Sequence, residues 1–319
     1  MNCGNSSRNH SDSAHQVVLL LFSVPTCLVG SALNGIALYA ICSKVKKPTK
    51  SFIYVVNLVI SDSLLLFALP FKVYAFFVNN GWSRKMGKNF CRVLESLCFV
   101  NTYTSILVIT LVCVDRYMAA AHPFKARTIS SPRTTAGVCA AIWILVCSCT
   151  IHIYFTSQSE SCFYHLSPHV LDIVFIAPLG FVFVVCALIM VLCSIRIVHT
   201  LRDRASDPRD RGNEKCTKVL LSNLFTFLIC FTPYHTALLL YASVVNGFIP
   251  EQYCERLRHA LHFTLYLANV NCCLDSIYYF YAIKELRRAE RVSGTAVPME
   301  VADTSMGSTV KELRDPPSH

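Results

Sequence analysis

Ionisable side chains stand inside long uncharged runs of this sequence, and their chemistry needs an explanation. Asp62 and Asp275 lie near the middle of two such runs, Asp115 and Arg116 end a third, and Lys72 lies toward the end of another. A charge in hydrocarbon costs at least ~2.5–3.5 kcal/mol on insertion scales, so such residues usually face a protein interior and bind or switch something. The alternative is that they only link helices by hydrogen bonds, at ~0.6 kcal/mol per contact.

Seven apolar runs must position these groups. Only 15% of the 319 residues are charged, against roughly 25% in soluble domains. A run of ~20 apolar residues can cross a ~30 Å hydrocarbon core as a helix. The sequence therefore predicts an all-α membrane protein, a seven-transmembrane helix bundle over residues 17–282. The helices are expected at about 17–42, 51–78, 89–121, 135–155, 169–200, 215–245 and 256–282.

The basic residues set the orientation of the bundle. The net charge is +10, and the connections on one face carry 19 Lys and Arg residues against 6 on the other. The positive-inside rule places the richer face in the cytoplasm. We therefore expect a multi-pass protein of the plasma membrane with an extracellular N-terminus, and we do not expect nucleic acid as a partner.

The segments that flank the bundle have compositions of their own. Residues 1–16 carry two glycosylation sequons, at Asn5 and Asn9, which agree with an extracellular tail. Residues 283–291 alternate basic and apolar side chains, as expected of an amphipathic helix on the anionic inner leaflet. Residues 292–319 are polar and predicted to be disordered, and the charged inner loop around 203–214 is predicted to be mobile.

Four cysteines fall in the outer segments: Cys3, Cys91, Cys162 and Cys254. An even number facing an oxidising space predicts two disulfides, and spacing alone leaves three connectivities open. The alternative is that these thiols are free.

Six short motifs occur in order along the chain, one on each of six expected helices. They are Asn34 within Gly30–Asn34, Asn57–Asp62, Asp115-Arg116-Tyr117, Trp143, Cys230-Phe231-Thr232-Pro233, and Asn271–Tyr279. Together they resemble the motifs of rhodopsin-like (class A) G-protein-coupled receptors over about residues 17–290. Within that family, the chain resembles most the branch of the lysophosphatidylinositol receptor and its kynurenate-responsive sister receptor.

Three positions depart from the family pattern. Cys186 and Ser276 stand where the family usually has prolines, in the fifth and seventh helices, and Ser194 replaces a tyrosine. Proline is a common cause of helix bends, so we expect those bends to be smaller or to be supported differently.

The resemblance implies a conformational switch. Phe231, above Pro233, would sense the ligand, and the sixth helix would swing outward at its inner end. Asp115 and Arg116 would hold the resting state, after which Arg116 would contact a heterotrimeric G protein. The remaining switch residues are Tyr117, Asp275 and Tyr279.

The resemblance also implies two further features. Asp62, Ser105, Asn271 and Asp275 would share a sodium ion in the resting core; the competing interpretation is a water-filled hydrogen-bond network. The disulfides would pair Cys91 with Cys162 and Cys3 with Cys254. No other cofactor is expected.

The ligand follows partly by exclusion. Cys98 stands where amine receptors carry an aspartate, which argues against a cationic amine. Cations at the outer ends suit a phosphate or carboxylate, and nearby apolar and aromatic residues suit an acyl chain or a flat ring. The predicted ligand-binding residues are Lys72, Glu95, Phe99, Tyr103, His169, Phe231, Tyr234 and Arg256. The alternative is that Lys72 pairs only with Glu95 and never contacts ligand.

The expected function is therefore a receptor for an anionic, lysophosphatidylinositol-type ligand. The alternatives are a receptor for a small aromatic carboxylate or nucleotide and, more remotely, a secondary transporter. Resemblance favours the Rho-activating twelve/thirteen class of G protein, with arrestin and receptor kinases acting on the Ser/Thr-bearing tail. An enzyme is not expected, because the sequence has no HExxH, GxSxG or Walker motif.

Overall fold

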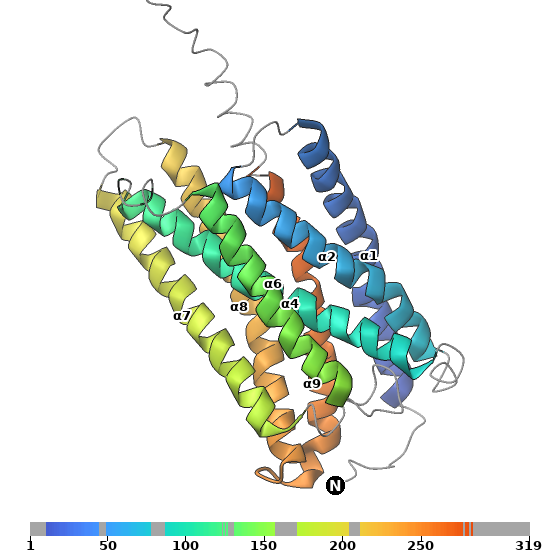
Figure 1. Ribbon diagram of the computed structural model, residues 1–319. Coiled ribbons are helices and arrows are strands. Elements are labelled where there is room, and N and C mark those ends of the chain that lie inside the picture. The colour runs from blue at the N-terminus through green and yellow to red at the C-terminus, as the bar shows by residue number, and fades with distance from the viewer. Residues whose placement is uncertain are drawn as a thin grey trace, which may run out of the picture.

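The computed structural model describes residues 11–44, 49–77, 87–122, 124, 126, 131–156, 171–203, 211–276, 278–280 and 282. Over these residues the chain is a bundle of long helices lying side by side (Figure 1), which confirms the predicted all-α, seven-helix architecture. The helices are α1 (Ser11–Lys44), α2 (Lys50–Phe77), α4 (Lys88–Ala121), α6 (Pro132–Thr156), α7 (Ile173–Asp203), α8 (Arg211–Val245) and α9 (Cys254–Asn269), with a 3-10 turn, η2 (Glu251–Tyr253), before α9.

Six of these helices, all except α9, are long and apolar enough to cross a membrane. The seventh span is divided, because α9 ends at Asn269 and helical structure resumes at residue 271. At the division, the Val270 N–H donates to the carbonyls of Tyr266 and Leu267 at 3.3 and 3.2 Å. The irregularity of this helix therefore lies before Ser276, the position that lacks the family's proline.

Several predicted boundaries differ from the observed ones. The first helix begins at Ser11 rather than residue 17, and α8 begins at Arg211, which shortens the predicted inner loop of residues 203–214. The fourth helix begins at Pro132, not residue 135. Proline fits the first turn of a helix, and the Ser131 Oγ accepts a hydrogen bond from the Thr134 N–H at 3.2 Å, as an N-cap does.

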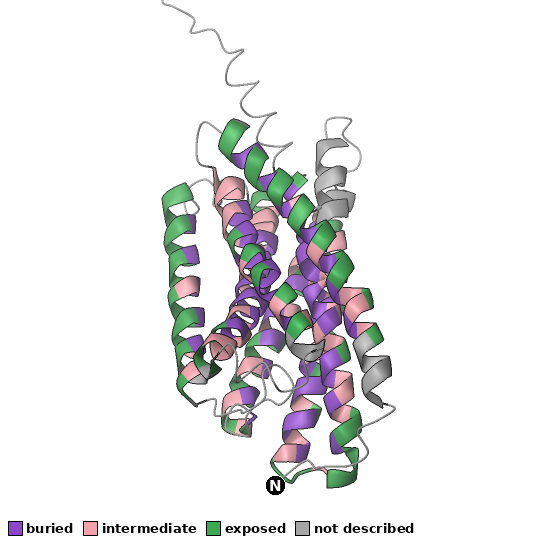
Figure 2. Cartoon of the chain, turned by 90° about the vertical axis from the view of Figure 1, so that its right-hand side faces the viewer, coloured by how far each residue is buried: buried purple, intermediate pink, exposed green. Residues whose placement is uncertain are grey.

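The bundle is apolar outside and polar inside. Large apolar side chains such as Leu28, Ile144 and Phe181 are exposed on its surface, whereas Asp62 and Asp275 are buried. Figure 2 shows buried residues along the inner faces of the helices and exposed ones on the outside. The central helix, α4, contacts α2, α6 and α7. This is the arrangement that a hydrocarbon solvent selects.

The bundle has an outer end and an inner end, according to its predicted orientation in the membrane. The outer end carries the beginnings of α4 and α9, with Cys91 and Cys254, and lies at the bottom of Figure 1. The inner end carries the beginning of α2 and the end of α4, with Lys50 and Arg116.

Gly30 sets the close approach of α1 to its neighbours. A Cβ at Gly30 would lie 2.8 Å from the Leu66 Cδ2 and 3.2 Å from the Cys272 Sγ, whereas one at Gly35 would meet nothing within 4 Å. We predict that Gly30→Val destabilises the fold by about 1–3 kcal/mol through overpacking, measured by thermal unfolding in detergent. Gly35→Val is the matched control, and equal losses in the two variants would contradict this packing.

Candidate functional site

Lys72 is a buried cation inside the bundle, toward its outer end. Its side chain, on α2, is 3% exposed, and the Nζ lies 5.0 Å from the centroid of the Tyr266 ring on α9. It also interacts electrostatically with Glu95 and Cys98 of α4. Three helices therefore surround this charge, in an environment where a cation attracts aromatic faces and anions.

Two further basic side chains of α9 are buried on the same side as Tyr266. Arg258 and His262 precede Tyr266 at spacings of four residues, and all three are buried. Residues four apart share a helix face, so these side chains lead from the outer end of α9 toward Lys72. Arg256, the predicted pocket residue, has an exposed side chain and, two residues before Arg258, lies on another face.

Aromatic side chains of α4 and α8 lie beneath the cations. Phe99 and Tyr103 are neighbours on α4, with ring centroids 4.5 Å apart, and Tyr103 meets His235 of α8 at 5.8 Å. Tyr234 contacts the His235 ring at 5.1 Å and interacts with Cys98, which also interacts with Lys72. The structure thus brings Phe99, Tyr103 and Tyr234 into one cluster that extends from the Lys72 region.

Phe231 closes the inner side of the cluster. It is buried and meets Phe227 edge-on at 5.4 Å, and Phe227 stacks on Phe183 of α7 at 5.7 Å. Phe183 stacks in turn on His235 at 4.1 Å. Phe231 therefore connects the aromatic cluster to the segment of α8 that contains Pro233.

Two polar atoms of the cluster lack a hydrogen-bond partner. The Tyr103 hydroxyl and the His235 Nε2 are buried without one, while the His235 Nδ1 lies 2.9 Å from the Phe231 carbonyl oxygen. A buried polar atom without a partner is costly, and a ligand's polar atom could satisfy it. Sequence reasoning did not select His235, although its position four residues after Phe231 places both on one helix face.

The Asp62 carboxylate is held in the middle of the bundle. Its Oδ1 accepts from the Asn101 Nδ2 at 3.1 Å, and its Oδ2 accepts a hydrogen bond from the Tyr279 hydroxyl. Three helical segments of the chain therefore meet at one carboxylate. Neither Asn101 nor Tyr279 was expected as its partner.

The other proposed sodium ligands lie in the same core. The Asn271 Nδ2 donates to the Asp275 Oδ2 at 2.8 Å, and the Asp62 and Asp275 carboxyls interact electrostatically. The Ser105 Oγ and the Asn271 Oδ1 are buried without a hydrogen-bond partner. These oxygens have the chemistry that a hard cation prefers, although Asp62 already accepts hydrogen bonds at both of its oxygens.

The inner end joins α4 to the first turn of α2. The Lys50 Nζ lies 2.8 Å from the Asp115 Oδ1, and the Arg116 Nη2 donates to the Ser51 Oγ at 2.6 Å. Tyr117 lies edge-on to His122 at 5.9 Å. Lys50 and Ser51 are partners that the sequence motifs did not indicate.

Some predicted residues lie outside the described part of the chain. These are His169, Cys3, Cys162, Asn5, Asn9, and residues 283–319. Cys91 and Cys254 are both disulfide-bonded, and their pairings with Cys162 and Cys3 stay predictions.

A bundle of long apolar helices with buried charges and an interior aromatic cluster is the architecture of a multi-pass membrane protein. The family described as 7 transmembrane receptor (rhodopsin family) matches residues 33–279, and the chain belongs to it. Its relatives are signalling receptors and not enzymes.

Three relatives illustrate the branch. Human G-protein coupled receptor 35 is 31% identical over 83% of this chain and 84% of its own length. Human lysophosphatidic acid receptor 4 is 31% identical over 82% and 73%. Mouse G-protein coupled receptor 55 is 32% identical over 89% and 91%. The chain is thus a multi-pass membrane protein similar to these class A receptors.

The Tyr279–Asp62 hydrogen bond provides a test of the polar core. We predict that Tyr279→Phe lowers the free energy of unfolding by about 1–3 kcal/mol, because a buried carboxyl oxygen loses its donor. Thermal unfolding in detergent measures the loss. Tyr39→Phe, at an exposed tyrosine of α1, is the control, and a Tyr279→Phe melting curve no different from it would show that the bond contributes nothing.

Proposed function

We propose that this protein is a receptor for an anionic, lipid-like ligand of the lysophosphatidylinositol type. The observation that carries the proposal is the buried Lys72 ammonium, 3% exposed and placed on the Tyr266 ring. A buried cation at the outer end of a bundle favours a ligand that brings an opposite charge.

The surroundings of Lys72 support both parts of such a ligand. Arg258 and His262 supply further basic groups on the same side of α9, and phosphate and carboxylate groups bind guanidinium and ammonium donors through charge-assisted hydrogen bonds. Phe99 and Phe231 supply apolar rings deeper in the bundle. A ligand with an anionic head at Lys72 and an apolar chain among the rings would match both the basic groups and the aromatic groups.

One observation favours the second candidate, a small aromatic carboxylate or nucleotide. The Tyr103 hydroxyl and the His235 Nε2 are unpartnered among the rings. An acyl chain offers them no polar atom, whereas a flat heteroaromatic ring could stack there and donate or accept hydrogen bonds. His235→Phe therefore separates the candidates, because it would weaken a heteroaromatic ligand and spare a lysolipid.

The proposed signal runs from Phe231 to the inner end of the bundle. Ligand binding would favour outward movement of the inner end of α8, and Arg116 would then contact a heterotrimeric G protein, with the twelve/thirteen class favoured. A ligand shifts such an equilibrium only through its different affinities for the two states. The proposal includes an extracellular N-terminus, a sodium ion or water network at Asp62 in the resting state, and arrestin and receptor kinases acting on the tail.

The charge of Lys72 is the first thing to test. In a cell assay of G-protein activation by lysophosphatidylinositol, we expect Lys72→Met to reduce potency roughly 10- to 100-fold, because an ionic hydrogen bond contributes about 1.5–3 kcal/mol. Lys72→Arg keeps the charge and should retain most of the response.

Surface expression of each variant is measured alongside, so that loss of folding is not read as loss of binding. Unchanged potency in well-expressed Lys72→Met would overturn the headgroup assignment. It would support the alternative in which Lys72 serves only as a partner of Glu95.

A further inference from the structure

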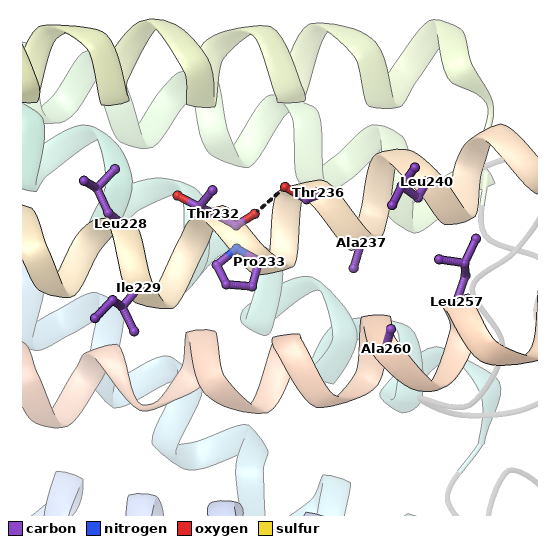
Figure 3. Close-up of a pocket in the computed structure, with 9 residues that line it drawn as sticks. All are labelled: Leu228, Ile229, Thr232, Pro233, Thr236, Ala237, Leu240, Leu257 and Ala260. Carbon is purple, nitrogen blue, oxygen red and sulfur yellow. Dashed lines mark hydrogen bonds between the residues drawn. The ribbon is translucent and has the colours of Figure 1, made fainter.

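An apolar groove lies on the outside of the bundle, between α8 and α9. It encloses about 630 Å³ and runs along α8 from Leu228 to Leu240. Figure 3 shows Pro233 and Ala237 of α8 facing Leu257 and Ala260 of α9 across it. The small side chains of Ala237 and Ala260 leave this space between the two helices.

The groove opens toward the hydrocarbon. Ile229, Thr232 and Leu240, which line it, are exposed on the outer face of α8. Thr236 adds little polarity to the groove, because its hydroxyl donates to the Thr232 carbonyl at 2.9 Å. In a protein surrounded by lipid, an occupant of such a groove comes from the membrane itself.

The groove has the length of an acyl chain within one leaflet. The thirteen residues from Leu228 to Leu240 rise roughly 18 Å along a helix, and half of the hydrocarbon core is about 15 Å thick. The groove therefore begins at Leu228, on the inner side of Pro233, and extends past Pro233 toward the outer end of the bundle, where Leu257 lines it.

A basic side chain, that of Arg256, lies at the outer end of the groove. Arg256 has an exposed side chain and lies one turn before Ala260, on the same face of α9. An exposed guanidinium at this boundary suits a phosphate, which it can bind with two parallel hydrogen bonds. A sterol has no anionic group to place there.

We propose that this groove binds one acyl chain of a phospholipid from the outer leaflet, with the lipid phosphate at Arg256. The inference rests on the proposed orientation of the receptor, but it needs neither the proposed ligand nor a G protein. The bound chain lies against Pro233, which has no N–H to donate to the Ile229 carbonyl. The site therefore adjoins the weakest point in the backbone ladder of α8.

Photocrosslinking tests the proposal on the full-length chain in nanodiscs. The probe is phosphatidylcholine with a diazirine in the middle of one acyl chain, and labelled peptides are mapped by mass spectrometry. We expect labelling to concentrate on residues 228–240 and on the part of α9 around Ala260.

Two kinds of variant should reduce that labelling. Ala260→Phe fills the groove and should lower labelling roughly fivefold or more, whereas Ala141→Phe, at an exposed alanine of α6, should leave it unchanged. Arg256→Gln should lower labelling and Arg256→Lys should retain most of it. Because Arg256 is exposed, its variants keep the test valid even if Ala260→Phe fails to fold.

Three results would overturn the proposal. They are labelling spread evenly over the lipid-facing helices, labelling unchanged in both Ala260→Phe and Arg256→Gln, and displacement of the probe from the groove by a sterol. Labelling is measured without agonist, so an absence of groove labelling leaves the receptor proposal intact. Conversely, the probe could still label the groove if the protein did not respond to lysophosphatidylinositol.

Discussion

Hydrocarbon cannot hydrogen-bond, and the rest of this structure depends on that constraint. Each helix must satisfy its own backbone and turn its polar side chains toward the other helices. Asp62, Lys72 and Asp275 are accordingly buried, whereas Leu28, Ile144 and other large apolar residues cover the surface. The interior polar groups are concentrated where helices meet, and the candidate sites are found there.

Three levels of polar chemistry follow one another along the bundle. Lys72 lies toward the outer end, beside the basic face of α9. In the middle, the Asp62 carboxylate accepts hydrogen bonds from Asn101 and Tyr279. At the inner end, Asp115 pairs with Lys50. The aromatic cluster around Phe231 lies close to the second level, because its residues Phe99 and Tyr103 flank Asn101 on α4. A ligand at one level can affect the next because α2 and α4 contribute residues to all three levels.

The fold was predictable because six of the seven predicted helices contain a run that is long and apolar enough to cross a membrane. The order of motifs likewise placed Asp62, Asp115 and Phe231 on the correct helices, and all three are described there. Helix starts were less predictable, since Pro132 with its Ser131 cap, and the charged first turns of α8, carry weak hydrophobic signals. The break at Val270 had no proline to mark it.

Contacts between helices were less accessible from the sequence. The rotation of α9 about its axis decides whether Arg256 or Arg258 is buried. These residues are only two positions apart, yet Arg258 is buried and Arg256 is exposed. The partners of Asp62 and Asp115 also depend on the rotation and depth of neighbouring helices. Local periodicity does not specify those quantities. The contacts of Tyr279 and Asn101 with Asp62, of Lys50 with Asp115, and of His235 with Phe183 could therefore be identified only from the structure.

The central claim is that the buried Lys72 ammonium receives the anionic head of the ligand. Solid-state NMR of receptor labelled with ¹⁵N at its lysine side chains, reconstituted in phosphorus-free detergent with lysophosphatidylinositol, can detect an ammonium close to the ligand phosphorus. The account predicts one dipolar-coupled lysine signal that disappears in Lys72→Met. A ligand-saturated receptor with no such coupling, or with a coupling that survives this substitution, would contradict it.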